Sequence, residues 1–226
     1  MDKVQNYIRK KAASKPNYCE FIYSGVRVCY KDEFVNEIFL EDSLKKIASI
    51  IPKRFLDKVD ILYVGNFSFL NKRSINALYE DGTIYLSNEQ DDQEDIMDDL
   101  IHEIAHAVED NYGDIIYFDG QLEREFLNKR KRLYEELLAY DENPPKKSLF
   151  YNIDYKEELD DYLYEQIGYE KLQHYSAGLF PSTYSITSLR EYFAIGFEIY
   201  YLEGPQELKQ FKELFIKINE VDDAKS

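Results

Sequence analysis

The spacing of apolar residues along this chain changes once, near Asn88, and that change constrains the fold more than any other feature. Before Asn88, short stretches rich in β-branched and aromatic residues alternate with turn residues, as strands do. Beyond it, apolar residues recur at helical spacing over about 92–111, 121–140, 155–173, 187–202 and 205–219. We therefore expect an α+β protein with a mixed front part and an all-helical back part.

The front part is expected to contain two hairpins and one further strand. The stretch YCEFIYSGVRVCY predicts two strands turned around Ser24 and Gly25, and SINALYEDGTIYLSN predicts two more around Asp81 and Gly82. VDILYVGN predicts a strand between them. That strand follows a helix over EDSLKKIASIIPKRF, which Pro52 should end or bend.

Composition excludes several classes of partner. The chain has 226 residues, and 44 acidic against 28 basic residues give a formal charge of −16. That charge repels phosphate backbones and anionic lipids, so we expect no nucleic acid and no membrane as a partner. No apolar run approaches the roughly 20 residues of a membrane-spanning helix.

The N-terminal region lacks the features of a targeting signal. Residues 2–12 predict a short amphipathic helix, and the positive charge there is not followed by the apolar core of a signal peptide. We therefore expect a cytoplasmic protein, or a secreted one if a longer precursor was processed. Cys19 and Cys29 are too few for a disulfide framework and are not spaced like zinc-binding pairs, so we interpret them as buried thiols.

Two of the three histidines lie four residues apart in the stretch DDLIHEIAHAVEDNYG. Apolar residues cover one side of this predicted helix, and acidic residues crowd its first turn, where the helix dipole favours them. His102 and His106 share a face of the helix. This is the spacing at which two imidazoles hold one tetrahedral zinc ion, with Glu103 placed to take the proton of a metal-bound water.

A catalytic zinc needs a third protein ligand and an open position for water. Tyr112 stands where a metzincin would carry a histidine, and His174 lies near a predicted helix end. The remaining candidates are Glu123 and Glu125 on the next predicted helix, and Glu191 on a strongly apolar helix much later in the chain. A lone carboxylate on the inner side of an apolar helix needs a partner, and a zinc ion is a suitable one.

The stretch HEIAHAVED, followed much later by YSITSLREYFA, resembles the catalytic domain of anthrax lethal factor and its relatives, including the clostridial Pro-Pro endopeptidases. These are gluzincins whose third zinc ligand is a glutamate opening an E-aromatic-F-A stretch, with a tyrosine seven residues before it. Here Tyr184 stands seven residues before Glu191. The resemblance implies that His102, His106 and Glu191 bind zinc. It also implies that Glu103 is the general base and that Tyr184 stabilises the oxyanion.

The resemblance also implies an architecture. We expect one zincin-like metalloprotease domain over residues 1–226, with an α/β lobe over about 1–90, a helical lobe over about 91–226, and an active-site cleft between them. The interval between the second histidine of the motif and Glu191 is longer than the family's. The surplus predicts a helical insertion at about 120–165.

The strand before the motif is expected to bind substrate. In zincins generally, an edge strand holds the substrate peptide extended across the metal, and GTIYLSN lies in the matching chain position. The expected substrate-binding residues are Thr83, Ile84, Tyr85 and Leu86.

The function we expect is a zinc-dependent endopeptidase that hydrolyses peptide bonds in extended segments of protein or peptide substrates, with Zn²⁺ as cofactor. Two alternatives remain open. HEIAHA also looks like the small metallopeptidases that cleave repressors, in which case Glu123 or Glu125 would be the third ligand. The other alternative is a non-catalytic protein that keeps zinc for structure or for binding a partner.

Overall fold

The computed structural model describes residues 18–23, 25–35 and 40–224, and for 18–23 it describes the backbone alone. The chain forms two compact units, Met1–Ile104 and Ala105–Ser226. The boundary between the units falls inside a single helix, α5 (Gln93–Tyr117). The helix expected over residues 2–12 lies outside the described residues.

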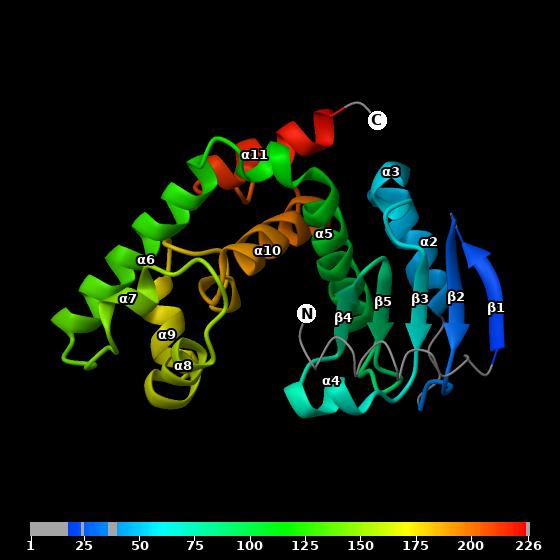
Figure 1. The fold of residues 1–226 in the computed structure, drawn as a ribbon, viewed down its shortest axis with the longest axis horizontal. Helices are drawn as coiled ribbons and strands as arrows, with labels where there is room; N and C mark the ends of the chain where they lie inside the picture. Colours follow the sequence, from blue (N-terminus) through cyan, green and yellow to red (C-terminus); the bar gives the residue numbers. More distant parts are fainter. Residues whose placement is uncertain (1–17, 24, 36–39, 225–226) are drawn as a thin grey trace. The chain divides into compact units, whose positions relative to one another are not determined.

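The first unit contains a five-stranded sheet with the strand order β1-β2-β3-β5-β4 (Figure 1). The β1–β2 and β4–β5 pairs are antiparallel, whereas the β2–β3 and β3–β5 pairs are parallel. Both predicted hairpins and the predicted strand between them are confirmed. The strands are β1 (Tyr18–Tyr23), β2 (Val26–Tyr30), β3 (Ile61–Val64), β4 (Ala77–Glu80) and β5 (Thr83–Leu86).

The hairpin of β4 and β5 turns on two residues with positive φ, Asp81 at 46° and Gly82 at 80°. Aspartate and glycine tolerate this conformation, and a two-residue turn of this kind matches the twist of antiparallel strands. The other side of β5 pairs with β3, in a register that places Ile61 opposite Thr83. The prediction that Thr83–Leu86 forms an edge strand is therefore wrong, because both sides of β5 are paired and β4 is the outer strand.

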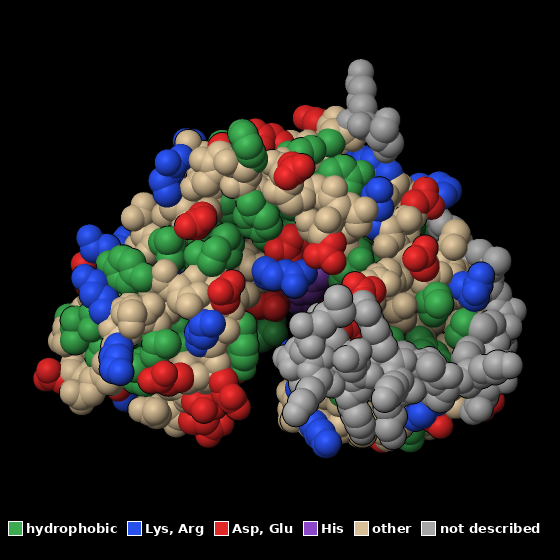
Figure 2. Space-filling model, in the orientation of Figure 1, with side chains coloured by type: hydrophobic (Ala, Val, Ile, Leu, Met, Phe, Trp, Pro, Cys, Tyr) green, Lys and Arg blue, Asp and Glu red, His purple; other side chains and the backbone are tan. Residues whose placement is uncertain are grey.

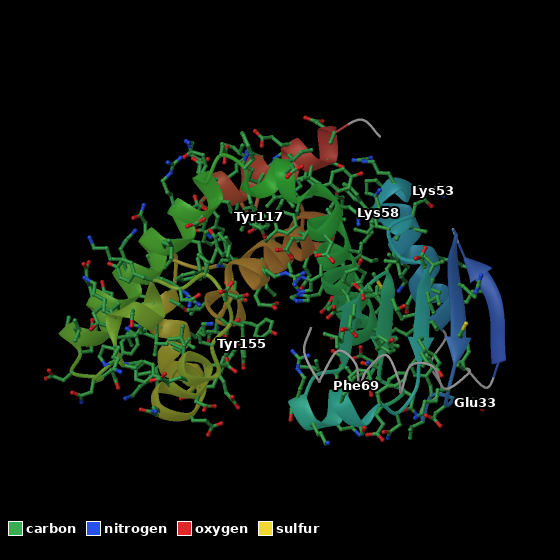
Figure 3. All side chains as sticks on the ribbon, in the orientation of Figure 1. Glu33, Lys53, Lys58, Phe69, Tyr117 and Tyr155 are labelled. Carbon is green, nitrogen blue, oxygen red and sulfur yellow. The ribbon has the colours of Figure 1, made fainter. Side chains whose placement is uncertain are left out.

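One face of the sheet is covered by aromatic side chains. Tyr63 and Tyr85 pack with Phe67 and Phe69, which lie at the start of α4 (Ser68–Arg73), and their ring centroids are 5.1 to 6.1 Å apart. Figure 3 labels Phe69 on that helix. Because side chains alternate along a strand, the neighbouring residues of β3 and β5 point to the opposite face.

The opposite face packs against helices. Leu62 and Ile84 line a small apolar cavity together with residues from α2 (Leu40–Ile50), α3 (Lys53–Leu56) and the first half of α5. As predicted, α2 ends just before Pro52, and a new short helix begins after it.

In its described residues, the second unit contains helices and loops but no strand, and it begins with the second half of α5. Its elements are α6 (Gln121–Ala139), α7 (Lys147–Phe150), α8 (Glu157–Asp161), the π-helix η1 (Tyr162–Ile167), α9 (Tyr169–Ser176), the 3₁₀ turn η2 (Tyr184–Ile186), α10 (Leu189–Leu202) and α11 (Lys212–Asp223). The helix predicted over 155–173 is instead three short elements, because the chain widens into a π-helix after α8 and then turns at Gly168, where φ is 83°. The helix predicted over 205–219 corresponds to α11, which begins later, at Lys212.

The helices of the second unit share an aromatic core. Phe126 of α6 contacts Phe180, in the loop after α9, and Tyr192 of α10, with ring centroids 6.1 and 5.6 Å away. Helices α10 and α11 approach closely at Gly196, where a Cβ atom would lie 2.6 Å from the side chain of Leu214. The α+β class is therefore confirmed, with a mixed front part and a helical back part, whereas the expected cleft stays a prediction.

Two further expectations concern Cys29 and the membrane. Cys29 is buried as expected but is part of a disulfide, so its interpretation as a free thiol is wrong; in the register of β1 and β2 it lies opposite Cys19. In the part of the chain that the structure describes, no helix is both long enough and apolar enough to cross a membrane.

Candidate metal centre

Helix α5 carries the HEIAH motif and presents its two histidines on one face. Ile101, Ala105 and Val108 are fully buried and anchor the helix, whereas His102 and His106 are only partly buried. Both imidazoles lie on the helix ahead of the kink at Tyr112, where φ is −118° and ψ is 15°. One turn of regular helix therefore separates them, which keeps the two rings side by side.

Helix α10 carries the third candidate, Glu191, in its first turn. Ser188 is the N-cap of this helix, and its side chain accepts a hydrogen bond from the backbone N–H of Glu191 at 3.1 Å. Ser188 and Glu191 stand at capping-box spacing, a sequence pattern that marks a helix start. The cap fixes the backbone of Glu191, while its carboxylate is turned toward His106.

The three candidate ligands lie together. His102, His106 and Glu191 each offer one ligand atom, and these atoms are all within 4.8 Å of one another. Nε2 of His106 and Oε2 of Glu191 are 3.6 Å apart, beyond a normal hydrogen bond. Two ligands about 2 Å from a tetrahedral zinc ion lie about 3.3 Å from each other, so the observed spacing suits a shared ion. Figure 2 shows histidine surface reaching solvent beside acidic and basic side chains.

Glu109 orients the ring of His106. It lies three residues further along α5, is only 5% exposed, and its Oε2 is 3.2 Å from Nδ1 of His106. A carboxylate at Nδ1 holds the proton on that nitrogen, so Nε2 keeps the lone pair that a metal needs. This is the arrangement by which proteins position imidazole ligands of zinc.

Two more side chains hold Glu109 in place. The hydroxyl of Tyr117, labelled in Figure 3, donates to Oε1 at 2.5 Å, and Nε of Arg190 donates to Oε2 at 2.8 Å. Although burial alone would raise the pKa of the Glu109 carboxyl, the hydrogen bond from His106 and the charge of Arg190 outweigh it and hold that pKa below its ordinary value. Glu109 therefore stays an anion beside the imidazole.

The predicted general base, Glu103, lies between the two histidines in sequence and is 7% exposed. Its Oε2 accepts a hydrogen bond from the backbone N–H of Tyr79 in β4 at 2.5 Å. Asn76 faces β5, because its carbonyl accepts from Ser87. In an antiparallel strand the backbone N–H groups of successive residues point alternately to its two sides, so the N–H of Tyr79, three residues after Asn76, points away from β5. Among the described strands β4 is outermost, so Glu103 lies at the outer edge of the sheet.

Tyr184 opens the turn η2, just before α10, and its side chain is 40% exposed. Its carbonyl accepts hydrogen bonds from the backbone N–H and the hydroxyl of Thr187, which fixes the turn. The reach of the Tyr184 hydroxyl toward the metal ligands stays a prediction.

The other candidate ligands are placed differently. Glu125 accepts hydrogen bonds from the hydroxyl of Tyr192 and from the backbone N–H groups of Glu213 and Leu214, so it caps α11. Glu123 is exposed on α6. In the described part of the chain, neither glutamate joins a group of metal-ligating side chains. His174 is exposed on α9 and lines a surface pocket instead.

Sequence reasoning missed Glu109, Tyr117 and Arg190. For Glu109 a signal was present, because an acidic residue three positions after a histidine shares its helix face. No comparable signal marks the other two, whose contacts depend on the kink in α5 and on the packing of α10.

Comparison with protein-family models, curated proteins and solved structures found no match to this chain. The assignment of the centre therefore depends on its own chemistry. Two imidazole nitrogens and one carboxylate oxygen are the donor set of a catalytic zinc site, and the carboxylate at Nδ1 of His106 completes the usual support of such a ligand.

Proposed function

We propose that the chain is a zinc-dependent endopeptidase. The observation that carries the proposal is the convergence of His102, His106 and Glu191 around one point, with Glu103 on the same helix as the two histidines. Three protein ligands leave the fourth position of a tetrahedral zinc for water, which is the mark of a catalytic rather than a structural site.

The chain's own residues then have defined roles. Zinc, when bound, supplies a Lewis acid that makes water acidic and polarises a carbonyl. Glu103 accepts the proton of the attacking water and passes it to the leaving amine. Tyr184 donates a hydrogen bond to the negative charge that develops on the scissile carbonyl oxygen. Glu109 keeps His106 in the tautomer that binds metal.

The outer strand β4 is the proposed site of substrate binding, in place of β5. An extended peptide adds to an outer strand through main-chain hydrogen bonds, and the N–H of Tyr79, which donates to Glu103, brings the proposed general base to that side of β4. The charge of −16 favours basic segments of other proteins as substrates.

The repressor-cleaving alternative has less support, because Glu125 is occupied as the cap of α11 and Glu123 is exposed. The non-catalytic alternative leaves Glu103 only its hydrogen bond from the backbone of Tyr79, since a structural zinc needs no general base.

The first experiment is tightly bound zinc per chain after dialysis against a weak chelator. We expect about one zinc per chain in the wild type, loss in Glu191→Ala, and retention in Glu123→Ala and Glu125→Ala. Loss in either α6 variant, with retention in Glu191→Ala, would transfer the third ligand to α6 and contradict the assignment.

The second experiment separates catalysis from binding. Wild type and Glu103→Gln are incubated with a library of extended peptides, and both should hold equal zinc. We expect zinc-dependent cleavage by the wild type and a loss of at least about 100-fold in the variant, because the proton acceptor is gone. Absence of cleavage by zinc-loaded wild type would favour the non-catalytic alternative.

A further inference from the structure

Arg130 is the largest fully buried side chain in the described part of the molecule, and its partners are all backbone carbonyls. Its Nε donates to the carbonyl of Ile186 at 2.7 Å, and Nη2 donates to Ile186 and, at 2.6 Å, to Thr187. Its Nη1 donates to Asn152 and, at 3.4 Å, to Leu149. The guanidinium therefore uses its whole fork of donors on main-chain oxygens.

These carbonyls come from two segments that are far apart in the chain. Leu149 and Asn152 lie at the end of α7, inside the helical insertion expected at about 120–165. Ile186 and Thr187 lie between Tyr184 and the start of α10. Arg130, which projects from α6, thus joins the insertion to the segment that leads into α10.

A second contact joins the same two loops. The backbone N–H of Leu189, the first residue of α10, donates to the carbonyl of Ile153 at 2.8 Å. Together with the cap at Ser188, this fixes the whole segment 184–191 from its first turn to its glutamate.

A buried arginine is not needed merely to fill space in the core. In the described part of the chain Arg130 belongs to no ion pair, and its guanidinium lies over the ring of Phe126, 4.6 Å from the centroid. Burial lowers the pKa of Arg130 to about 9, so the group remains charged at neutral pH. Well-packed apolar residues often replace a buried charge without loss of stability, whereas only a planar fork can align several carbonyls at once.

We propose that Arg130 is a positioning residue, which sets the backbone of segment 184–191 and thereby the places of the Tyr184 hydroxyl and the Glu191 carboxylate. The catalytic part of this inference depends on the proposed peptidase function, whereas the positional part does not. Residues 120–165, the expected insertion, would then have an internal role: they supply both the guanidinium and half of the carbonyls that accept its hydrogen bonds.

The positional part is tested by hydrogen exchange in the zinc-free protein, read by mass spectrometry on peptides that cover 184–191. Arg130→Met removes the donors and keeps much of the apolar volume. Arg130→Lys keeps the charge but offers only three donors, so it should rescue in part. Lys129→Met is the matched control, because it removes the neighbouring charge on α6, which faces Phe211 instead.

We expect the exchange rate in 184–191 to rise about tenfold or more in Arg130→Met and by less in Arg130→Lys, while exchange in α11 stays unchanged in both variants. In Lys129→Met, exchange in 184–191 should equal that of the wild type. Unchanged exchange in 184–191, or a uniform rise across the helical unit, would overturn the proposal. If Arg130→Met does not fold, the same comparison made with Arg130→Lys decides it.

The catalytic part is tested by a double-mutant cycle on kcat. In the wild-type background Tyr184→Phe should lower kcat, whereas in Arg130→Lys the same change should have at most about half that logarithmic effect, because the phenol is already displaced. Equal effects in both backgrounds would show that Arg130 does not act through Tyr184. A wild type without zinc-dependent cleavage would end the peptidase proposal, and the exchange measurement would still decide the positional one.

Discussion

Replacing Glu109 by glutamine tests whether the carboxylate behind His106 supports metal binding. Oε2 of Glu109 accepts hydrogen bonds from both His106 and Arg190, and Oε1 accepts one from the hydroxyl of Tyr117. Glutamine has the same shape: its carbonyl can take the two nitrogen donors, and its amide can donate to the oxygen of Tyr117. The change thus keeps the hydrogen bonds near His106 and removes the negative charge.

The expected effect is on zinc affinity. Loss of an outer partner of a zinc-binding histidine weakens metal binding by about 10- to 100-fold, which corresponds to about 1.4 to 2.8 kcal/mol. Because Glu109 is 5% exposed, solvent screens its charge poorly, and we expect the upper half of that range.

The assay is competition for zinc with a chromophoric chelator of known affinity at fixed pH and salt. Asp110→Asn is the matched control, since Asp110 is the neighbouring acid, contacts Arg190 at 3.3 Å and has a side chain that is 51% exposed. We expect a change of at most about twofold in the control. A zinc affinity in Glu109→Gln within about twofold of the wild type would refute the reasoning, as would equal losses in the two variants.

Three further outcomes follow from other contacts. Glu125→Ala should lower the free energy of unfolding by about 2 kcal/mol in urea titrations without changing zinc content, because α11 loses its cap and the hydroxyl of Tyr192 its acceptor. Tyr184→Phe should lower kcat by about 10- to 1000-fold at unchanged zinc content, as measured under saturating peptide. Burial raises the pKa of Asp99 to about 6, although Gln90 donates to it. Between about pH 4 and 6, Asp99 is therefore protonated in the folded zinc-free protein and ionised in the unfolded chain. The free energy of unfolding should fall as pH rises through that window. Asp99→Asn should make it less dependent on pH, as measured by urea titrations at pH 4.5 and 7.5.

Local signals predicted most of the secondary structure. The Asp81–Gly82 turn and the helical spacing of α6 are properties of a few adjacent residues, and the structure has both where the sequence indicated. The position of β5 inside the sheet depends on its parallel pairing with β3, which joins segments some twenty residues apart. No local pattern distinguishes an inner from an outer strand of a hairpin, so the edge was assigned to the wrong one.

The candidate site divides in the same way. His102 and His106 follow from spacing on one helix. Glu191, which lies 85 residues beyond His106, is one of three candidates on local grounds, and only the resemblance singles it out. In the sequence, Arg130 looks like any other charged residue on an amphipathic helix. Its four carbonyl partners belong to segments far away in the chain, so no local pattern predicts the contact. Cys29 was misjudged for a related reason, because its disulfide depends on the register of β1 and β2.

The clamp at Arg130 also has a consequence for the order of folding. Its carbonyl partners lie 19, 22, 56 and 57 residues away along the chain, so the guanidinium stays hydrated until all of those segments have gathered. We therefore predict that these contacts are absent from the folding transition state, so that Arg130→Lys accelerates unfolding and leaves the refolding rate nearly unchanged in stopped-flow urea jumps. On this prediction Arg130 would set the lifetime of the native state, because it would slow the opening of the segment that carries Glu191.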